Sequence, residues 1–245
     1  MQKEAINRRY EKLSANHHAE ISIININDPE APKCNMTEEC HRTVLVINSA
    51  RVPEDRYESF LAYYVSKCLL PQLVLSTERL ILRRFRLEDA ADCFSFLSDM
   101  EGTYMDCSRS YVSMDEEFSD LMESFAQQQT RYVITLKKTG KVIGTVNLFE
   151  DNSRAVETME IGYAVSPQYQ RKGYAFEALT ALLNLLQIDL FYDLVLAGVL
   201  PENENSIGLL RKLGFEKEGI RRKAIWHEGR NRPVDLVYYY RERES

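Results

Sequence analysis

The chain lacks an apolar run long enough to cross a bilayer, and no apolar segment follows its basic beginning at residues 1–10. These absences argue against a membrane-spanning segment and against a secretory signal. Cysteine is scarce, and an odd count of five without regular spacing suits a reducing cytoplasm better than a disulfide framework. The formal net charge of −6 argues against nucleic acid as the main partner. We therefore expect a cytoplasmic protein that binds neither membrane nor nucleic acid.

A metal site is not expected either. Cys34, Cys40 and His41 lie close together, but their spacing matches no usual zinc pattern and a fourth ligand is missing. Free thiols and a surface imidazole are the simpler interpretation. Apolar residues make up 44% and charged residues 28% of 245 residues, which is enough for one large or two small globular domains.

The most informative segment is a turn at residues 166–175, which follows a strand pattern at Thr158–Val165 and opens a helical one. It has neither the spacing of a nucleoside-triphosphate loop nor that of a dinucleotide fold. Gly173 stands where the helix begins, so unpaired N–H groups and the helix dipole are available to an anion. Arg171 and Lys172 add positive charge. The turn is predicted to bind a pyrophosphate.

Residues 170–175 match the Gln/Arg-x-x-Gly-x-Gly/Ala signature of the GNAT acetyltransferases. Three further segments resemble the same family, in the family's order, and together they extend from about Leu73 to the end of the chain. They are Thr77–Arg83, which resembles the opening strand of the RimJ/RimL branch, Glu160–Val165, and Pro201–Ser206 followed by Leu209–Phe215. The RimJ/RimL branch acetylates protein N-termini and other amines. The chain therefore resembles this branch of the GNAT superfamily.

The resemblance implies an α/β (α+β) GNAT fold, in which a mixed central sheet flanked by helices splays between its fourth and fifth strands. Hydrophobic periodicity agrees with the family's order of elements. It predicts strands at 73–86, 131–137, 142–149, 158–165, 194–200, 216–226 and 234–240, and helices at 87–100, 114–129, 174–186 and 206–213. The GNAT domain is assigned to residues 71–245.

Residues 1–70 form an extension of unknown role with its own α/β pattern. Strands are predicted at Glu20–Asn27 and Thr43–Ile47, and a helix is predicted to start at Pro53 and to end before Pro71. Packing against the catalytic domain or against a second subunit, as in a homodimer, is the default interpretation. A regulatory role is the alternative.

The resemblance also implies acetyl-CoA as the co-substrate. Its pyrophosphate is expected on the turn, and its pantetheine arm is expected to pair like an added strand with main-chain groups of the strand before it. Asn203 and Ser206 match the Asn-x-x-Ser motif of the branch, in which the asparagine contacts the cofactor and the serine lies near its sulfur. The predicted cofactor-binding residues are Tyr163, Ala164, Val165, Gln170, Arg171, Lys172, Gly173, Tyr174, Ala175, Asn203 and Ser206.

Gly162, on the same strand, has two interpretations. A bulge at Gly162 would break the ladder and free the neighbouring main-chain groups. Alternatively, close packing against a neighbour would leave no room for a side chain at this position. A free N–H near Val165 would then polarise the thioester carbonyl.

Ser206 is the candidate for protonating the departing thiolate, although Asn205 or Ser206 could equally cap the short helix there. Many GNAT enzymes have a tyrosine four residues after this serine, where this chain has Leu210. Glu160 is the candidate base acting through water, and the alternative is a strand carboxylate paired with an arginine.

Another glutamate is used by some RimL-like enzymes, in the strand that follows the Gly-Phe pair. The matching position in this chain is Ile225. His227 and Glu228 are close enough in sequence to substitute for it, but an exposed turn is the simpler expectation for both.

The acceptor is expected to be a primary amine: a protein N-terminus first, and a polyamine, amino acid or aminoglycoside second. Asp99, Glu101 and Asp106 would hold a cationic group, and Tyr104, Tyr111 and Trp226 would wall the pocket. The acidic run at 115–123 is expected to be a solvated helix face. The same cradle would accept another acyl group. The alternative of a different class is a CoA-binding sensor or interaction protein without turnover.

Overall fold

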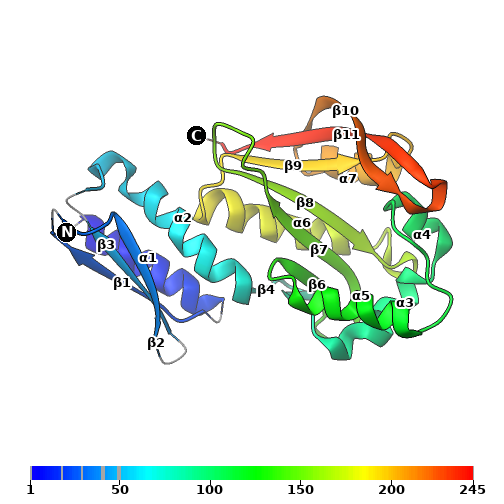
Figure 1. The fold of residues 1–245 in the computed structure, drawn as a ribbon, viewed down its shortest axis with the longest axis horizontal. Helices are drawn as coiled ribbons and strands as arrows, with labels where there is room; N and C mark the ends of the chain where they lie inside the picture. Colours follow the sequence, from blue (N-terminus) through cyan, green and yellow to red (C-terminus); the bar gives the residue numbers. More distant parts are fainter. Residues whose placement is uncertain (1, 18, 29, 40–41, 49–50, 245) are drawn as a thin grey trace.

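The structure is a computed structural model that describes residues 2–17, 19–28, 30–39, 42–48 and 51–244. Within these residues the strands form a three-stranded sheet near the N-terminus and an eight-stranded sheet in the remainder of the chain. Figure 1 shows the small sheet with α1 and α2 beside it, and the large sheet flanked by the other helices. No described helix is long and apolar enough to cross a membrane.

The N-terminal unit contains both strands and the helix that the sequence predicted, together with a helix and a strand that it did not. Strand β3 is the middle strand of the small sheet: it pairs with β1 in parallel and with β2 in the antiparallel direction. The unpredicted helix α1 is rich in charge, and its apolar side is narrow, which explains why periodicity failed to indicate it. The bounds are α1 (Gln2–Asn16), β1 (Ile21–Ile26), β2 (Cys34–Glu39), β3 (Arg42–Asn48) and α2 (Tyr57–Leu69).

The large sheet has the strand order β10-β11-β9-β8-β7-β6-β5-β4. Its strands are β4 (Val74–Ser76), β5 (Leu80–Arg84), β6 (Arg131–Leu136), β7 (Val142–Glu150), β8 (Thr158–Val165), β9 (Leu194–Val199), β10 (Glu216–His227) and β11 (Arg232–Glu242). Its helices are α3 (Ala90–Leu97), α4 (Met100–Met105), α5 (Glu116–Gln127), α6 (Tyr174–Asn184) and α7 (Glu204–Lys212). The element order predicted from the sequence is confirmed.

Two predicted elements are each divided in the structure. The extended run at 73–86 is the antiparallel pair β4 and β5, joined by a turn in which the Thr77 N–H donates to the Leu80 carbonyl at 2.9 Å. The helix predicted at 87–100 ends at Leu97, and α4 starts separately because the Asp99 carboxylate accepts the Gly102 N–H at 2.6 Å. This cap begins a new helix in a new direction.

The splay of the sheet lies between β8 and β9, the fourth and fifth of the strands predicted for the domain. β8 pairs with β7 from Met159 to Val165, but it pairs with β9 only from Thr158 to Glu160. Beyond Glu160 the two parallel strands are no longer paired, so one edge of β8 faces a gap.

Side chains that alternate along the strands place the helices on opposite faces of the large sheet. Tyr132 and Ile134 belong to the core beneath α6, which also includes residues of α2, whereas Val133 packs with α3 and α5. The first of these cores continues into the N-terminal unit without interruption. Polar contacts reinforce the junction: the Tyr132 hydroxyl donates to the Leu70 carbonyl at 2.5 Å.

Candidate active site

A cavity of about 660 Å³ opens where β8 and β9 separate, between α4, the start of α6 and the start of α7. Every residue predicted to bind the cofactor lines it except Lys172. Ser206 is among them, and Glu160 is not. The cavity therefore brings together segments that are far apart in the sequence.

The turn before α6 has the conformation that phosphate binding needs. Gly173 has φ +81° and is the residue that directly precedes the helix. A side chain is strained in that left-handed conformation, which explains the glycine. The first intrahelical bond runs from the Glu177 N–H to the Gly173 carbonyl at 3.0 Å, so the preceding N–H groups of the helix have no intrahelical acceptor. Arg171, with φ +59°, lines the cavity beside them.

Arg79, which the sequence did not single out, braces this turn from the start of β5. Its Nη1 donates to the Lys172 carbonyl at 3.1 Å, its Nε pairs with Glu177 at 2.5 Å, and its guanidinium lies 4.5 Å from the centre of the Tyr174 ring. The Lys172 side chain is directed elsewhere, because its Nζ donates to the Gln168 carbonyl at 2.7 Å. The prediction of a side-chain contact from Lys172 to the cofactor thus finds no support in the cavity lining.

Only alternate residues of β8 direct their main-chain N–H and C=O groups into the gap. The Ser166 N–H donates to the Ile143 carbonyl of β7 at 2.8 Å, and Thr145 is opposite Ala164 in the same register. Because main-chain groups alternate along an antiparallel strand, those of Ala164 point toward β7, and those of Tyr163 and Val165 point into the gap. The Val165 carbonyl accepts the Gln170 side chain at 2.9 Å, which leaves its N–H available.

Gly162 is neither a bulge nor a tight contact. The ladder between β7 and β8 runs past it without a register shift, and an added Cβ would lie 3.8 Å from Phe149, an ordinary distance. The tight position is Gly144 on β7, where an added Cβ would overlap the Ala164 carbonyl. The register of β6 and β7 shifts at this point, after Ile134. Both interpretations of Gly162 were therefore wrong, and the glycine with the steric constraint lies on the neighbouring strand.

Asn203, rather than Asn205 or Ser206, caps α7. Its Oδ1 accepts the Ser206 N–H at 3.1 Å, and its Nδ2 donates to the Met105 carbonyl of α4 at 3.4 Å. The Ser206 hydroxyl is therefore not used as a cap and remains in the cavity lining. Asn205 accepts Arg171 Nη1 at 2.9 Å, which ties the phosphate turn to α7.

Glu160 lies on the other side of β8, next to the C-terminal strands. The Tyr238 hydroxyl donates to Glu160 Oε1 at 3.0 Å and accepts Arg221 Nη1 at 3.1 Å. Burial raises the pKa of Glu160, and burial together with the Glu160 charge raises the pKa of Tyr238 to about 12. The expected arginine is thus linked to Glu160 by hydrogen bonds through a tyrosine, and its charge also acts on Glu160. Tyr238 and Arg221 were missed because they are distant in sequence from Glu160 and belong to no motif.

The acidic residues expected near the acceptor are in the cavity. Asp99, Glu101 and Asp106 all line it, and Asp99 also serves as the cap of α4. Asp106 is exposed at the mouth of the cavity, but the surrounding wall partly desolvates its carboxylate and raises its pKa to about 7. Burial, together with the charge of Asp106, raises the pKa of Tyr163 to about 12.

The three aromatic residues expected to wall this pocket do not line the cavity. Tyr104 packs against His227 at 4.6 Å between ring centres and accepts Arg230 Nε at 2.8 Å, and Tyr111 packs against Phe118. Trp226 remains 50% exposed on β10.

His227 was expected in an exposed turn, and this is wrong, because its side chain is fully buried. Its Nδ1 accepts the Arg230 N–H at 3.2 Å, and burial lowers its pKa. Glu228 is exposed, as are the acidic residues of α5.

In the parts of the chain that the structure describes, no three His, Cys, Asp or Glu side chains are grouped to hold a metal ion. Cys40 and His41, considered for such a site, lie outside those parts.

The sheet splays after Glu160, and the turn that opens α6 lies at this opening; comparison with known proteins gives the family of this fold. A family model described as an acetyltransferase (GNAT) domain matches residues 79–216. The chain belongs to this family and is an acetyl-CoA-dependent N-acetyltransferase.

Three similar proteins illustrate the relationship. An uncharacterized N-acetyltransferase p20 from Bacillus licheniformis is 35% identical, over 67% of this chain and 93% of its own length. The [ribosomal protein uS5]-alanine N-acetyltransferase of Escherichia coli is 29% identical, over 65% of this chain and 87% of its own. The crystal structure of a GNAT acetyltransferase from Bacillus anthracis superposes with a TM-score of 0.60 at 25% identity, and covers 71% of this chain and all of that one.

Proposed function

We propose that this enzyme transfers the acetyl group of acetyl-CoA to a primary amine, with a protein N-terminus as the preferred acceptor, in the cytoplasm. One observation carries the proposal. A single cavity is lined by the phosphate turn, the free edge of β8, Ser206 and an acidic wall from α4. These are the parts that bind an acyl-CoA and present an amine to its thioester.

The cofactor is proposed to enter along the gap between β8 and β9. Its pyrophosphate would be bound by the N–H groups that open α6 and by Arg171. Its pantetheine arm would pair with the main-chain groups of Tyr163 and Val165, which point into the gap. The Val165 N–H would stabilise negative charge on the carbonyl oxygen during the reaction.

The amine nitrogen attacks the thioester carbon, the C–N bond forms, and the C–S bond breaks as the tetrahedral intermediate collapses. The nitrogen loses a proton to a base, and the thiolate gains one from an acid. Ser206 is the proposed acid because its hydroxyl lines the cavity and is not engaged in capping α7.

For the base we favour Asp106 over Glu160. Asp106 lies in the cavity, and its pKa of about 7 suits a base that works near neutral pH. As a carboxylate it would also attract the ammonium form of the acceptor. Glu160 is the second candidate, since it is held by Tyr238 outside the cavity lining.

A protein N-terminus is favoured for two reasons. Its amine has a pKa of about 8, so it needs less help to lose a proton than a lysine or polyamine amine with a pKa above 10. A relative that is 29% identical is a [ribosomal protein uS5]-alanine N-acetyltransferase. A polyamine, an amino acid or an aminoglycoside is the second choice.

Steady-state release of free CoA thiol, measured with the purified protein across a panel of amines, tests this proposal. The panel contains short peptides with free N-termini, the same peptides with blocked N-termini, polyamines and aminoglycosides. We expect release to depend on a free peptide N-terminus. Tight CoA binding without release for any amine would support a non-catalytic CoA sensor instead. Propionyl-CoA in parallel tests whether the acyl group is acetyl.

A further inference from the structure

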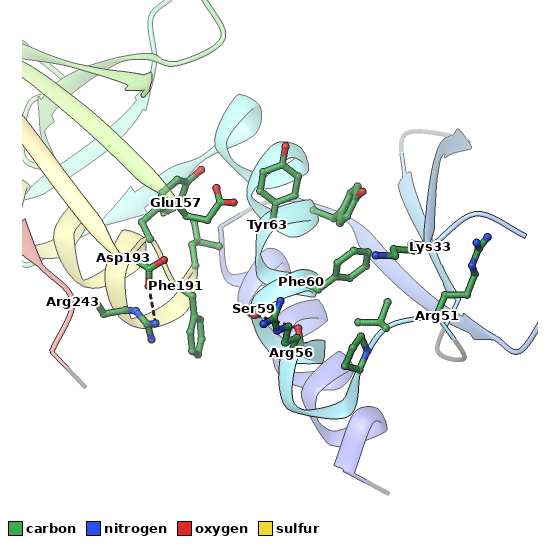
Figure 2. Close-up of a pocket in the computed structure, with 15 residues that line it drawn as sticks. Lys33, Arg51, Arg56, Ser59, Phe60, Tyr63, Glu157, Phe191, Asp193 and Arg243 are labelled. Atoms are coloured by element: carbon green, nitrogen blue, oxygen red, sulfur yellow. Dashed lines mark hydrogen bonds and ion pairs between the residues drawn. The ribbon is translucent and has the colours of Figure 1, made fainter. Parts of the chain in front are cut away.

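A second cavity, of about 520 Å³, lies at the junction of the N-terminal unit and the GNAT domain. Small-molecule sites are typically about 300–1,000 Å³ and often occur at such boundaries. Figure 2 shows α2 in the middle, with Phe191, Asp193 and Arg243 on one side and Lys33 and Arg51 on the other. We name this cavity the α2 trough. It shares no lining residue with the candidate active site.

The α2 trough is rich in positive charge although the chain as a whole has a net charge of −6. Lys33, Arg51, Arg56 and Arg243 line it, and the acids are Glu157 and Asp193. Asp193 is occupied by Arg243 Nη2 at 2.9 Å. Within the residues that the structure describes, Lys33, Arg51 and Arg56 form no ion pair with an acid. One end of the trough therefore offers cations to an anionic group.

Aromatic rings line the space next to these cations. Phe60, Tyr63 and Tyr64 project from α2, with ring centres 4.9 Å apart for Phe60 and Tyr64 and 5.2 Å apart for Tyr63 and Tyr64. Phe191 lies on the opposite side, with the Arg243 guanidinium 4.8 Å from its ring centre. Phe191 has φ +60°, a conformation that is unfavourable for a bulky side chain and that accumulates at ligand sites.

We infer that the α2 trough binds a small ligand with an anionic group and a flat ring, the chemistry of a nucleoside phosphate. The phosphate would contact Lys33, Arg51 and Arg56, and the base would stack on the aromatic rings of α2. Glu157 is at the other end and would accept a hydrogen bond from a sugar hydroxyl. It would also repel the phosphate, which fixes the orientation of the ligand.

The site is separate from the cofactor cavity and lies just before β8 and β9. Glu157 directly precedes β8 and Asp193 directly precedes β9, and the Asp193 N–H donates to the Glu157 carbonyl at 2.9 Å. The α2 trough therefore lies at the beginning of the two strands whose far ends separate at the active site. The α2 trough and the cofactor cavity can therefore each hold a ligand at the same time, and the test uses this property.

Isothermal titration calorimetry of AMP into the full chain, loaded with one equivalent of CoA so that the cofactor cavity is filled and the α2 trough is left open, tests the inference. We expect saturable binding that is tighter than the binding of inorganic phosphate or adenosine alone. The double variant Lys33→Gln/Arg56→Gln should bind AMP at least about ten-fold more weakly, because charge-assisted contacts are lost. The matched control is Arg8→Gln, an exposed arginine of the same unit outside the trough. Its affinity should be unchanged.

The inference is overturned if AMP does not bind the protein that carries one equivalent of CoA, or if the double variant binds AMP as tightly as the unchanged chain. Phosphate that binds as tightly as AMP would overturn the part of the inference that concerns the aromatic rings. Because every readout is binding, a protein without acetyl transfer would still give a result. The inference and the proposed function can therefore fail separately.

Discussion

Asn203 makes two contacts with one side chain, and these contacts join opposite walls of the cavity. Its Oδ1 holds the Ser206 N–H at the start of α7, and its Nδ2 holds the Met105 carbonyl at the end of α4, one residue before Asp106. The proposed acid and the proposed base are therefore positioned by the same amide. The role of a residue in this site therefore depends on the hydrogen bonds that hold it in place.

The pH dependence should identify the base. If Asp106 accepts the proton from the amine, it must be ionised, so kcat/KM should rise with pH through about 7, its pKa in the structure. Asp106→Asn should remove this rise and lower kcat/KM by about 100-fold or more, the usual contribution of a general base.

Glu160→Gln is the matched control for Asp106→Asn. It should keep the rise near pH 7 and lose less activity. The opposite result, with the rise lost only in Glu160→Gln, would transfer the role of base to Glu160.

Ser206→Ala separates catalysis from binding. The Asn203 cap uses the main-chain N–H of residue 206, which alanine retains, so α7 and CoA affinity should be preserved. Loss of the hydroxyl should lower kcat by about ten-fold, since a thiolate is a good leaving group that needs modest help. CoA titration and steady-state rates measure the two effects. An unchanged kcat would show that the Ser206 hydroxyl has no part in proton transfer.

Among the secondary-structure elements, β8 is the one on which the proposed cofactor position depends, because its two edges differ. One edge is fully paired with β7, and the other loses β9 after Glu160. The close approach of Gly144 to Ala164 fixes the paired edge and so sets the position of the free one. The beginning of α6 then places the phosphate turn at the end of that free edge.

Gly144→Ala should disturb the active site from the neighbouring strand. The added Cβ would overlap the Ala164 carbonyl and force β8 to shift, at a cost of about 1–3 kcal/mol in stability and with a loss of CoA affinity. Gly162→Ala is the matched control, since its added Cβ would lie 3.8 Å from the Phe149 ring, an ordinary van der Waals distance. Thermal unfolding and CoA titration of both variants are the measurements. Equal behaviour of the two would contradict this account of β8.

At the scale of the whole molecule, the N-terminal unit and the GNAT domain share one hydrophobic core. Leu61 and Leu69 of α2 are buried in the same cluster as Leu186 and Tyr192 of the GNAT domain. The Tyr192 hydroxyl also donates to Ser66 of α2 at 3.3 Å. The described residues of the N-terminal unit thus pack as part of the folded protein, and we propose that their specific role is to complete the α2 trough.

A shared core predicts a single unfolding transition, and the chain has one tryptophan to report it. Trp226 lies on β10, in the GNAT domain. Leu69→Ala, in the other unit, should lower the free energy of unfolding seen by Trp226 fluorescence by about 2–5 kcal/mol, because Leu69 is fully buried. Leu87→Ala, at a leucine that is 53% exposed, is the control and should change it little. If Leu69→Ala left the unfolding followed by Trp226 fluorescence unchanged, the two units would be unfolding independently.

The sequence by itself determined the order of the elements and the turn at Gly173 that opens α6. Each of these depends on neighbours along the chain: a glycine at positive φ before a helix, alternating apolar residues in a strand, an apolar stripe in a helix. The splay after Glu160 and the cofactor residues were expected from the family resemblance, since no local pattern specifies either of them.

Only the tertiary structure decided which side chains meet. Tyr238 with Glu160, Arg79 with Glu177, and Asn203 with Met105 are joined by the pairing of strands and the packing of helices, not by spacing in the sequence. The same holds for Gly144, whose constraint comes from the strand beside it. The cavity wall around Asp106 raises its pKa by desolvation although the side chain stays exposed, and that wall exists only after folding. A local pattern specifies main-chain geometry, whereas distant contacts require the whole fold.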